Sequence, residues 1–356
     1  MSIMLGETLC DCIFLVYLSQ HYGAMNREQE LEILLRKYKM LGIDSQIDYN
    51  KFYLYSIITH STAIEGSTIT EIENQLLFDQ GISAGGRTLI EQYMNLDLKV
   101  AYERCLELAN SHSAITIEML KELSSLTMKN TGQQYKTALG EFSSAKGDLR
   151  LVNVTAGVGG RSYLSYNKIP LKLQEFCDEL NLKRKNVGRK TIIDQYLLSF
   201  DAHYDLVTIH PWADGNGRMS RLLMNMIQFE FRLVPSKILK EDKEQYIKAL
   251  VETRELEDKS IFRNYMLDVM IKNLKHDIKA YSDSTGEDIP VINSKEKSWE
   301  KIVRLLGENS YMTIASLSEA LGISTTAVER YISRLKADGI ISRIGPDKGG
   351  HWKVNH

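Results

Sequence analysis

HPWADGNGRMSR, from His210 to Arg221, is the stretch from which the fold and the chemistry of this chain follow. It brings an imidazole, a carboxylate, a glycine-flanked asparagine and two guanidinium groups together within a few turns of backbone. Pro211 keeps the residue before it out of helical geometry, so we expect one element to end at His210. From Arg218 onward, the sequence RMSRLLM predicts a helix whose first turn lies beside the glycines.

Each polar position in this stretch has a physical reason. His210 carries the side chain whose ordinary pKa lies near neutrality, so it can take a proton from an attacking hydroxyl. Gly215, Asn216 and Gly217 tolerate positive φ, which lets successive backbone N–H groups converge on an anion at the start of a helix. Asp214 supplies the hard oxygen ligands that Mg²⁺ prefers.

The two arginines complete the set. Arg218 and Arg221 are three residues apart on the expected helix, so both can reach one polyphosphate. A lone Gly-Asn-Gly is usually a turn, and a lone histidine beside proline is usually a packed loop residue. Here nine of the twelve positions carry a residue type that suits this chemistry, and such a combination does not arise by chance. The stretch therefore predicts phosphoryl chemistry on a nucleotide with a divalent metal.

The same stretch resembles the signature of the Fic family, H-P-[FW]-x-[DE]-G-N-G-R-x-x-R, with every specified position present and Trp212 at the aromatic position. The resemblance covers about residues 50–235. It implies that the chain transfers AMP from ATP to a Tyr, Thr or Ser hydroxyl of a protein and releases pyrophosphate. The implied site consists of the catalytic base His210, the Mg²⁺ ligand Asp214, and the ATP-binding residues Gly215, Asn216, Gly217, Arg218 and Arg221.

A second motif lies far upstream. Residues 51–65, KFYLYSIITHSTAIE, predict a helix that ends at Gly66, and Ser61 and Glu65 share one face of it. The segment from Ser61 to Gly66 resembles the Fic inhibitory motif, [ST]-x-x-x-E-[GN], in which the glutamate pairs with the second arginine of the signature. The resemblance implies that Glu65 holds Arg221 away from the γ-phosphate. The alternative is a surface glutamate at a helix end.

A third feature lies between the two motifs. Residues 151–154 and 162–166 have strand-like composition and flank the glycine-rich residues 156–160. We expect a β-hairpin here, and the resemblance implies a flap that aligns the target segment by strand addition. The alternative is an ordinary surface hairpin. Residues 140–142 resemble the start of the family's flap, but Ser143 stands where an arginine is common, so no role is transferred to it.

Helix-spaced apolar residues dominate the rest of the chain as far as residue 271, including residues 88–111, 115–130, 171–183 and 190–209. The predicted fold class is mainly α: a Fic helical core with a small β-hairpin flap, plus a C-terminal winged-helix domain. His203 lies seven residues before His210, on nearly the same helical face. It is either a second functional imidazole or a packing and hydrogen-bonding residue.

The C-terminal part changes character. Residues 281–296 are polar with Gly and Pro, which is typical of a linker. Beyond it, helices at 297–306, 313–321 and 325–338, followed by a glycine-bearing hairpin, resemble a winged helix-turn-helix. Residues 324–356 hold six Lys and Arg against three Asp and Glu, a modest positive excess. DNA contact through Arg330 and Arg334 is one interpretation, and dimerisation or protein docking is the other.

The predicted domain division follows these features. Residues 1–104 form an N-terminal helical region with the inhibitory helix at about 51–66, residues 105–280 the catalytic domain, 281–296 the linker, and 297–356 the winged helix-turn-helix. The natural start, Met1 or Met25, stays open. So does a homodimeric state.

Bulk properties exclude some partners. The 356 residues include 44 Lys and Arg and 46 Asp and Glu, a net charge of −2, so there is no global attraction to nucleic acid or membrane. No segment approaches a transmembrane helix in length, and we expect no membrane partner. Four cysteines lack metal-binding spacing and are expected to be reduced in a cytoplasmic protein: Cys10, Cys12, Cys105 and Cys177.

Three other functions compete with AMP transfer. The first is a kinase like the death-on-curing toxins, which bind the nucleotide reversed; those relatives depart at the second glycine of the signature, whereas this chain keeps Gly217 and Arg218. The second is removal of AMP, with Glu65 activating water. The third is a DNA-binding regulator that uses the Fic portion as a nucleotide sensor.

Overall fold

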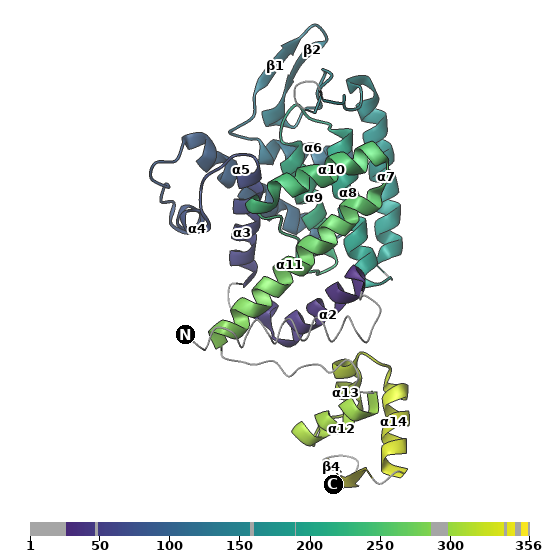
Figure 1. The fold of residues 1–356 in the computed structure, drawn as a ribbon. Helices are drawn as coiled ribbons and strands as arrows, with labels where there is room; N and C mark the ends of the chain where they lie inside the picture. Colours follow the sequence, from purple (N-terminus) through teal and green to yellow (C-terminus); the bar gives the residue numbers. More distant parts are fainter. Residues whose placement is uncertain are drawn as a thin grey trace, which may run out of the picture. The chain divides into compact units, whose positions relative to one another are not determined.

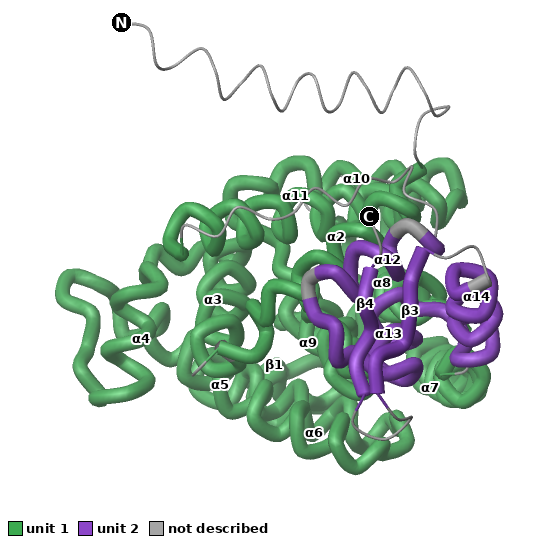
Figure 2. The backbone as a smooth tube through the Cα atoms, turned by 90° about the horizontal axis from the view of Figure 1, so that it is seen from below, with its two compact units in different colours: residues 1–285 green, residues 286–356 purple. Residues whose placement is uncertain are grey.

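The computed structural model describes residues 26–46, 49–156, 160–188, 190–285, 298–337, 340–345 and 350–354. The chain folds into two compact units, Met1–Thr285 and Gly286–His356 (Figures 1 and 2). The alternative start at Met25 lies outside the described residues, and so do Cys10, Cys12 and most of the predicted linker. The division of the first unit at residue 104 stays a prediction.

The first unit is built almost entirely of helices, so the predicted mainly α class is confirmed (Figure 1). None of the helices in the described part of the chain is both long and apolar enough to cross a membrane. The helices are α2 (Arg27–Met40), α3 (Tyr49–Ile64), α4 (Glu71–Gln80), α5 (Leu89–Asn110), α6 (Ile117–Thr127), α7 (Ile169–Val187), α8 (Ile192–Ile209), α9 (Asn216–Glu230), α10 (Lys243–Leu256) and α11 (Lys259–Thr285).

Helix α9 lies at the centre of this unit, and α5 and α8 pack against it. Leu222, Leu223 and Ile227 are fully buried, as expected for a helix covered on all sides. Burying each such side chain contributes roughly 1.5–3 kcal/mol. Because α9 is a buried helix, the backbone of its first turn is held in position, as a binding site requires.

The two neighbouring helices begin at strong local signals. Thr88 caps α5 and Thr191 caps α8, and each threonine side chain accepts from the backbone of the residue three positions on. Those residues, Glu91 and Asp194, accept in return from the threonine backbone, which completes a capping box at both helices. A cap of this kind stabilises a helix by about 1 kcal/mol.

A buried polar network fixes the C-terminal end of α3. Thr62 Oγ1 donates to Asn95 Oδ1 of α5 at 2.7 Å, and Asn74 Nδ2 of α4 donates to the same oxygen at 2.8 Å. Asn95 Nδ2 donates to Ser67 Oγ at 3.1 Å. Removing one member would leave a buried partner unsatisfied, which costs about 1–3 kcal/mol. The network therefore holds the end of α3 in place just before Glu65.

The strands of the first unit do not lie where the sequence predicts them. A small antiparallel hairpin is present, formed by β1 (Gln134–Thr137) and β2 (Gly140–Ser143), and it projects from one end of the unit (Figure 1). Residues 140–142, expected to start the flap, lie inside β2. In the described part of residues 151–166, the two segments pair at one isolated antiparallel bridge, between Thr155 and Ser162. Hydrogen bonds from Tyr163 N to Val154 O at 3.0 Å and from Ala156 N to Arg161 O at 3.2 Å hold this bridge.

The predicted hairpin is therefore present only as this short antiparallel pairing, and the regular strands expected at 151–154 and 162–166 do not form. Arg150 binds both segments instead. Its Nη1 donates to Val152 O at 2.6 Å, and its Nη2 donates to Leu164 O. These two carbonyls lie in the segments predicted as strands, and the guanidinium takes both of them. Tyr166 then begins the 3₁₀ helix η3 (Tyr166–Lys168).

The second unit has the predicted order of elements: α12 (Ser298–Glu308), α13 (Ile314–Leu321), α14 (Thr325–Ala337), β3 (Ile341–Ile344) and β4 (His351–Val354). Gly322 ends α13 in the left-handed conformation, with φ of 64°, and so makes the tight turn between the second and third helices. Leu317, Val328 and Trp352 belong to a separate buried core. The unit thus packs around its own apolar cluster.

Candidate active site

His210 ends α8, as the following proline predicts. Its backbone has φ of 53°, in the left-handed region, and its N–H donates to Leu206 O at 3.1 Å. A non-glycine residue held there costs about 1–3 kcal/mol, and such strain is common at functional sites. His210 Nδ1 lies 3.2 Å from Val207 O, so Nδ1 carries the proton and donates it. Nε2 is thereby left as the basic nitrogen.

The surroundings of the imidazole keep it neutral. Tyr163 stacks on His210 with ring centroids 3.8 Å apart and an interplanar angle of 15°. The Arg254 guanidinium lies 5.2 Å from the centre of the Tyr163 ring. Burial lowers the pKa of His210 to about 4, and the charges of Arg150 and Arg254 act in the same direction. At neutral pH the ring is therefore in the form that can accept a proton.

Arg150 ties the segment after residue 150 to His210. It is fully buried, its Nε donates to His210 O at 2.8 Å, and its backbone N–H donates to Pro211 O at 3.0 Å. Burial lowers the pKa of the Arg150 guanidinium. Sequence reasoning missed this residue, because an isolated arginine in a loop carries no pattern that predicts hydrogen bonds to distant backbone groups.

The loop before α9 is fixed by its own side chains. Asn216 Nδ2 donates to Trp212 O at 2.8 Å, and Trp212 N donates to Asn216 Oδ1 at 3.1 Å. The predicted phosphate ligand Asn216 thus uses its side chain to shape the loop and keeps only its backbone amide for an anion. Gly215 has φ of 83°, and a Cβ there would lie 2.8 Å from Met128 Sδ, so the position requires glycine.

Arg218 is a buried cation with unused hydrogen-bonding capacity. Its side chain is 3% exposed, and its Nε and Nη1 atoms have no partner within the described residues. Its ion pair with Asp214 is long, at 3.7 Å between Nη2 and Oδ1, and the Asp214 side chain is 57% exposed. Buried unpaired donors are costly unless a ligand satisfies them. The arrangement is suited to binding an anion.

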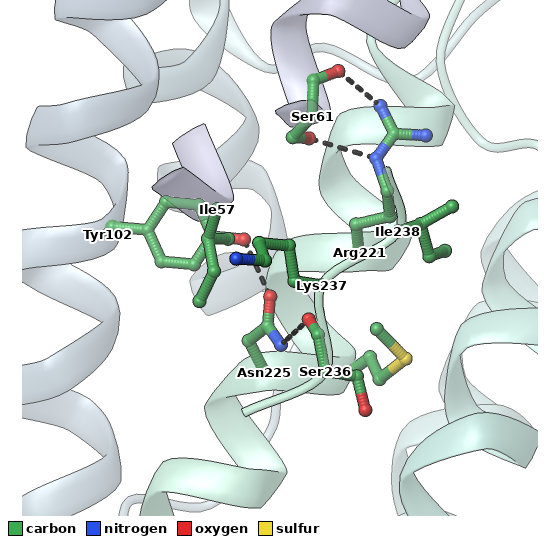
Figure 3. Close-up of a pocket in the computed structure, with 9 residues that line it drawn as sticks. Ile57, Ser61, Tyr102, Arg221, Asn225, Ser236, Lys237 and Ile238 are labelled. Carbon is green, nitrogen blue, oxygen red and sulfur yellow. Dashed lines mark hydrogen bonds between the residues drawn. The ribbon is translucent and has the colours of Figure 1, made fainter. Parts of the chain in front are cut away.

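The structure brings Ser61 and Glu65 to Arg221, as the motif implies. Arg221 Nη2 donates to Ser61 O at 3.0 Å, and Nε donates to Ser61 Oγ at 2.9 Å (Figure 3). Arg221 Nη2 also lies 2.6 Å from Glu65 Oε1. Burial raises the pKa of Glu65, but the charge and hydrogen bond of Arg221 outweigh it, so the pKa is lowered. The carboxylate is therefore charged while it holds the arginine.

Glu65 also occupies the space in front of α9. A Cβ placed on Gly217 would lie 2.6 Å from Glu65 Oε1. The carboxylate thus lies against the first helical turn, where the backbone N–H groups and the helix dipole attract an anion. A phosphate in the same place would meet both the bulk and the charge of Glu65.

A small cavity lies beside Arg221, between α3, α5 and α9 (Figure 3). Its volume is about 10 Å³, which is room for roughly one water. Tyr102 Oη donates to Asn225 Oδ1 at 2.7 Å in its wall, and Asn225 Nδ2 donates to Ser236 O at 2.9 Å. The cavity is too small for a nucleotide, so it is not the candidate site.

The residues present suit Mg²⁺ only together with a nucleotide. The described part of the chain holds no group of three or more His, Cys, Asp or Glu side chains that could form a metal site by itself. Asp214 offers an exposed carboxylate at the start of α9. Mg²⁺ usually binds one or two carboxylates plus substrate phosphates and waters, and this position fits that pattern.

His203 takes the packing and hydrogen-bonding role. It is fully buried, its ring stacks on Phe262 with centroids 5.0 Å apart, and its Nε2 lies 2.9 Å from Tyr246 Oη. The sequence places it near His210 along α8, but the structure gives it no access to solvent. It is not a second imidazole open to substrate.

Comparison with known proteins agrees with this geometry. Residues 114–228 match the Fic/DOC family, and residues 300–342 match the winged helix-turn-helix DNA-binding family. The chain therefore carries a Fic/DOC domain and a C-terminal winged helix-turn-helix.

Similar proteins include protein adenylyltransferase Fic of Drosophila grimshawi, 26% identical over 82% of this chain and 54% of the relative. Protein adenylyltransferase fic-1 of Caenorhabditis elegans is 27% identical over 56% of this chain and 36% of the relative. The chain thus spans about half, or less, of the length of these relatives. The Fic domain containing signaling protein of Bacteroides thetaiotaomicron shares the fold, with a TM-score of 0.60, 24% identity, and coverage of 73% of this chain and 100% of that one.

Proposed function

We propose that this chain is a self-inhibited protein adenylyltransferase, which transfers AMP from ATP to a Tyr, Thr or Ser hydroxyl of a protein. The observation that carries the proposal is the buried Arg218, two of whose nitrogens have no partner among the residues that the structure describes, in the same segment as the neutral imidazole of His210. The reaction requires a cation that can bind the phosphates and a base that can accept the proton of the hydroxyl, and Arg218 and His210 meet these two requirements. The adenylyltransferase names of the relatives support it.

In this reaction, the target hydroxyl loses its proton to His210 Nε2, and its oxygen attacks the α-phosphorus of ATP. The bond between the α-phosphorus and the bridging oxygen to the β-phosphate breaks, and pyrophosphate leaves with that electron pair. The Tyr163 stack and the hydrogen bond to Val207 O hold the imidazole in one orientation. General base catalysis by a positioned group contributes about 10²- to 10⁴-fold to the rate.

The phosphates would be held by the start of α9. The backbone amides of Asn216 and Gly217 and the guanidinium of Arg218 face the α- and β-phosphates, and Arg221, once released, reaches the terminal ones. Asp214 would hold Mg²⁺, which when bound neutralises charge on the phosphates. All these groups belong to one loop and one helix, so substrate binding orients the α-phosphorus relative to His210.

Self-inhibition follows from the position of Glu65. An arginine that is paired at 2.6 Å with a carboxylate cannot also grip the γ-phosphate, and the carboxylate repels that phosphate. Ser61 adds two hydrogen bonds to the same guanidinium. Activation therefore requires α3 to release Arg221.

Labelling from two forms of radioactive ATP tests the proposed reaction. Protein incubated with the Glu65→Gly form should acquire label from α-³²P-ATP and none from γ-³²P-ATP. Label from γ-³²P-ATP alone would identify a kinase, and loss of label from a previously adenylylated protein would identify AMP removal. Nucleotide binding without any label on protein would overturn transfer and favour a nucleotide-sensing regulator.

A cytoplasmic location is part of the proposal. The two cysteines within the described residues, Cys105 and Cys177, are free thiols and buried. Burial raises the pKa of the Cys177 thiol to about 12, which leaves it unreactive at neutral pH. Free thiols of this kind suit a reducing compartment.

We further propose that the winged helix contacts DNA through α14. Arg330 and Arg334 are exposed on this helix, which occupies the place of a recognition helix. Replacing both by alanine should weaken DNA binding and lower the slope of log K against log salt by about 0.9 for each phosphate that is no longer neutralised. Electrophoretic shifts at several salt concentrations measure this, with Lys301→Ala in α12 as control. A wild-type chain that shifts no DNA at low salt would leave docking or dimerisation as the role of this unit.

A further inference from the structure

The Arg221 guanidinium has a neighbour outside both motifs. Its Nη1 donates to Tyr246 Oη at 3.4 Å, and its central carbon lies 5.9 Å from the centre of the Tyr246 ring. Tyr246 belongs to α10, whereas Ser61 lies in the last turn of α3 and Glu65 directly follows that helix. Tyr246 is almost completely buried, and it contacts His203 of α8 and Phe262 of α11.

The hydrogen bonds run in one direction only. A guanidinium has no acceptor, so the Tyr246 oxygen accepts from Arg221, and its own proton is free for another partner. That partner is His203, whose Nε2 lies 2.9 Å from Tyr246 Oη. His203 therefore accepts at Nε2 and carries its proton at Nδ1, which has no partner within the described residues.

The neutral form of His203 agrees with its surroundings. Burial lowers the pKa of His203 to about 3, and the charge of Arg221 acts in the same direction. A protonated ring would carry hydrogen on Nε2 and could no longer accept from Tyr246. The ring is fully buried on α8 and stacks on Phe262 of α11. The side chains that contact Arg221 on this side, directly or through Tyr246, therefore lie on α8, α10 and α11.

We propose that Tyr246 and His203 form a positioning pair, which holds Arg221 for the terminal phosphates of ATP after Glu65 has left. This inference rests on the proposed function, in which Arg221 grips those phosphates. When α3 releases the arginine, the hydrogen bonds to Ser61 and Glu65 break together, because Ser61 lies in the last turn of α3 and Glu65 directly follows it. The bond to Tyr246 then limits the freedom of a long side chain whose ordering otherwise opposes binding.

The pair predicts a selective loss of ATP binding. In the Glu65→Gly background, Tyr246→Phe should raise the KM and Kd for ATP about three- to tenfold, the effect of removing one hydrogen bond. The affinity for AMP, which has no β- or γ-phosphate, should stay within about twofold, and kcat should change little. Tyr265→Phe is the matched control, because Tyr265 packs near Tyr246 and its hydroxyl donates to Asp242 O.

Two substitutions at His203 complete the test. His203→Leu removes the acceptor and should reproduce the ATP defect of Tyr246→Phe, whereas His203→Gln keeps an acceptor and should restore most of the affinity. If both Tyr246→Phe and His203→Leu bind ATP and AMP with the affinities of the Glu65→Gly parent, the proposed pairing is wrong. An equal loss of ATP and AMP affinity would also overturn it, because it would show general damage. If the Glu65→Gly parent binds no ATP, the proposed function fails first, and the positioning role fails with it.

Discussion

Replacing Glu65 by glycine should raise AMP incorporation from ATP about 10- to 100-fold. The substitution frees Arg221 for the terminal phosphates and removes the carboxylate whose Oε1 lies 2.6 Å from a Cβ built on Gly217. A hydrogen bond to a charged group contributes about 1.5–3 kcal/mol, and each 1.4 kcal/mol corresponds to a factor of ten. Incorporation of label from α-³²P-ATP into the chain itself measures the effect.

One substitution separates charge from bulk at this position, and a second tests the buried network beside it. Glu65→Gln keeps the size of the side chain and removes its charge, so it should give an increase smaller than Glu65→Gly. Thr62→Ala keeps the Glu65 side chain but removes the hydrogen bond to Asn95, and it should lower thermal stability through the network that holds the end of α3. Wild-type incorporation by both Glu65 variants would show that α3 does not inhibit the enzyme.

His210→Ala, made in the Glu65→Gly background, should lower the rate of AMP transfer about 10²- to 10⁴-fold. ATP affinity should stay within about twofold, because the imidazole faces the hydroxyl and not the phosphates. Single-turnover labelling and calorimetric ATP binding measure the two quantities. His112→Ala is the control, since His112 contacts Glu230 at the far end of α9. Transfer at the parental rate would place the base elsewhere.

His210 also determines how kcat/KM depends on pH. Burial lowers the pKa of His210 to about 4, below the ordinary value of 6.5, so the neutral base is present above that pH and is lost as the pH falls through 4. Since kcat/KM reports the free enzyme, it should not fall between pH 7.5 and about 5 through this group. A decline centred near pH 6.5 that disappears in His210→Ala would contradict the shift.

Local signals in the sequence predicted most of the helical frame. Pro211 marks the end of α8, and the helix spacing of RMSRLLM marks α9. The pairing of Glu65 with Arg221 spans 156 residues, which no local pattern provides. It was predicted because two motifs of one family occur together in the chain. The inhibitory effect of that pair stays a proposal until incorporation is measured.

The remaining parts of the site depend on packing between distant elements. Arg150 and Tyr163 surround His210, yet each is a single residue in an irregular segment without periodicity. The segments predicted as strands near residues 151–166 pair at a single bridge, and composition does not show that a guanidinium binds the carbonyls of Val152 and Leu164 there. Tyr246 reaches Arg221 from α10, outside every recognisable motif.

A structure of the Glu65→Gly form with ATP and Mg²⁺ tests the central claim most directly. The proposal predicts the triphosphate against the first turn of α9, with Arg221 turned from Ser61 to the terminal phosphates and room for a hydroxyl between the α-phosphorus and Nε2 of His210. If the nucleotide lies elsewhere, or the start of α9 stays closed although Glu65 is gone, the enzymatic account is wrong.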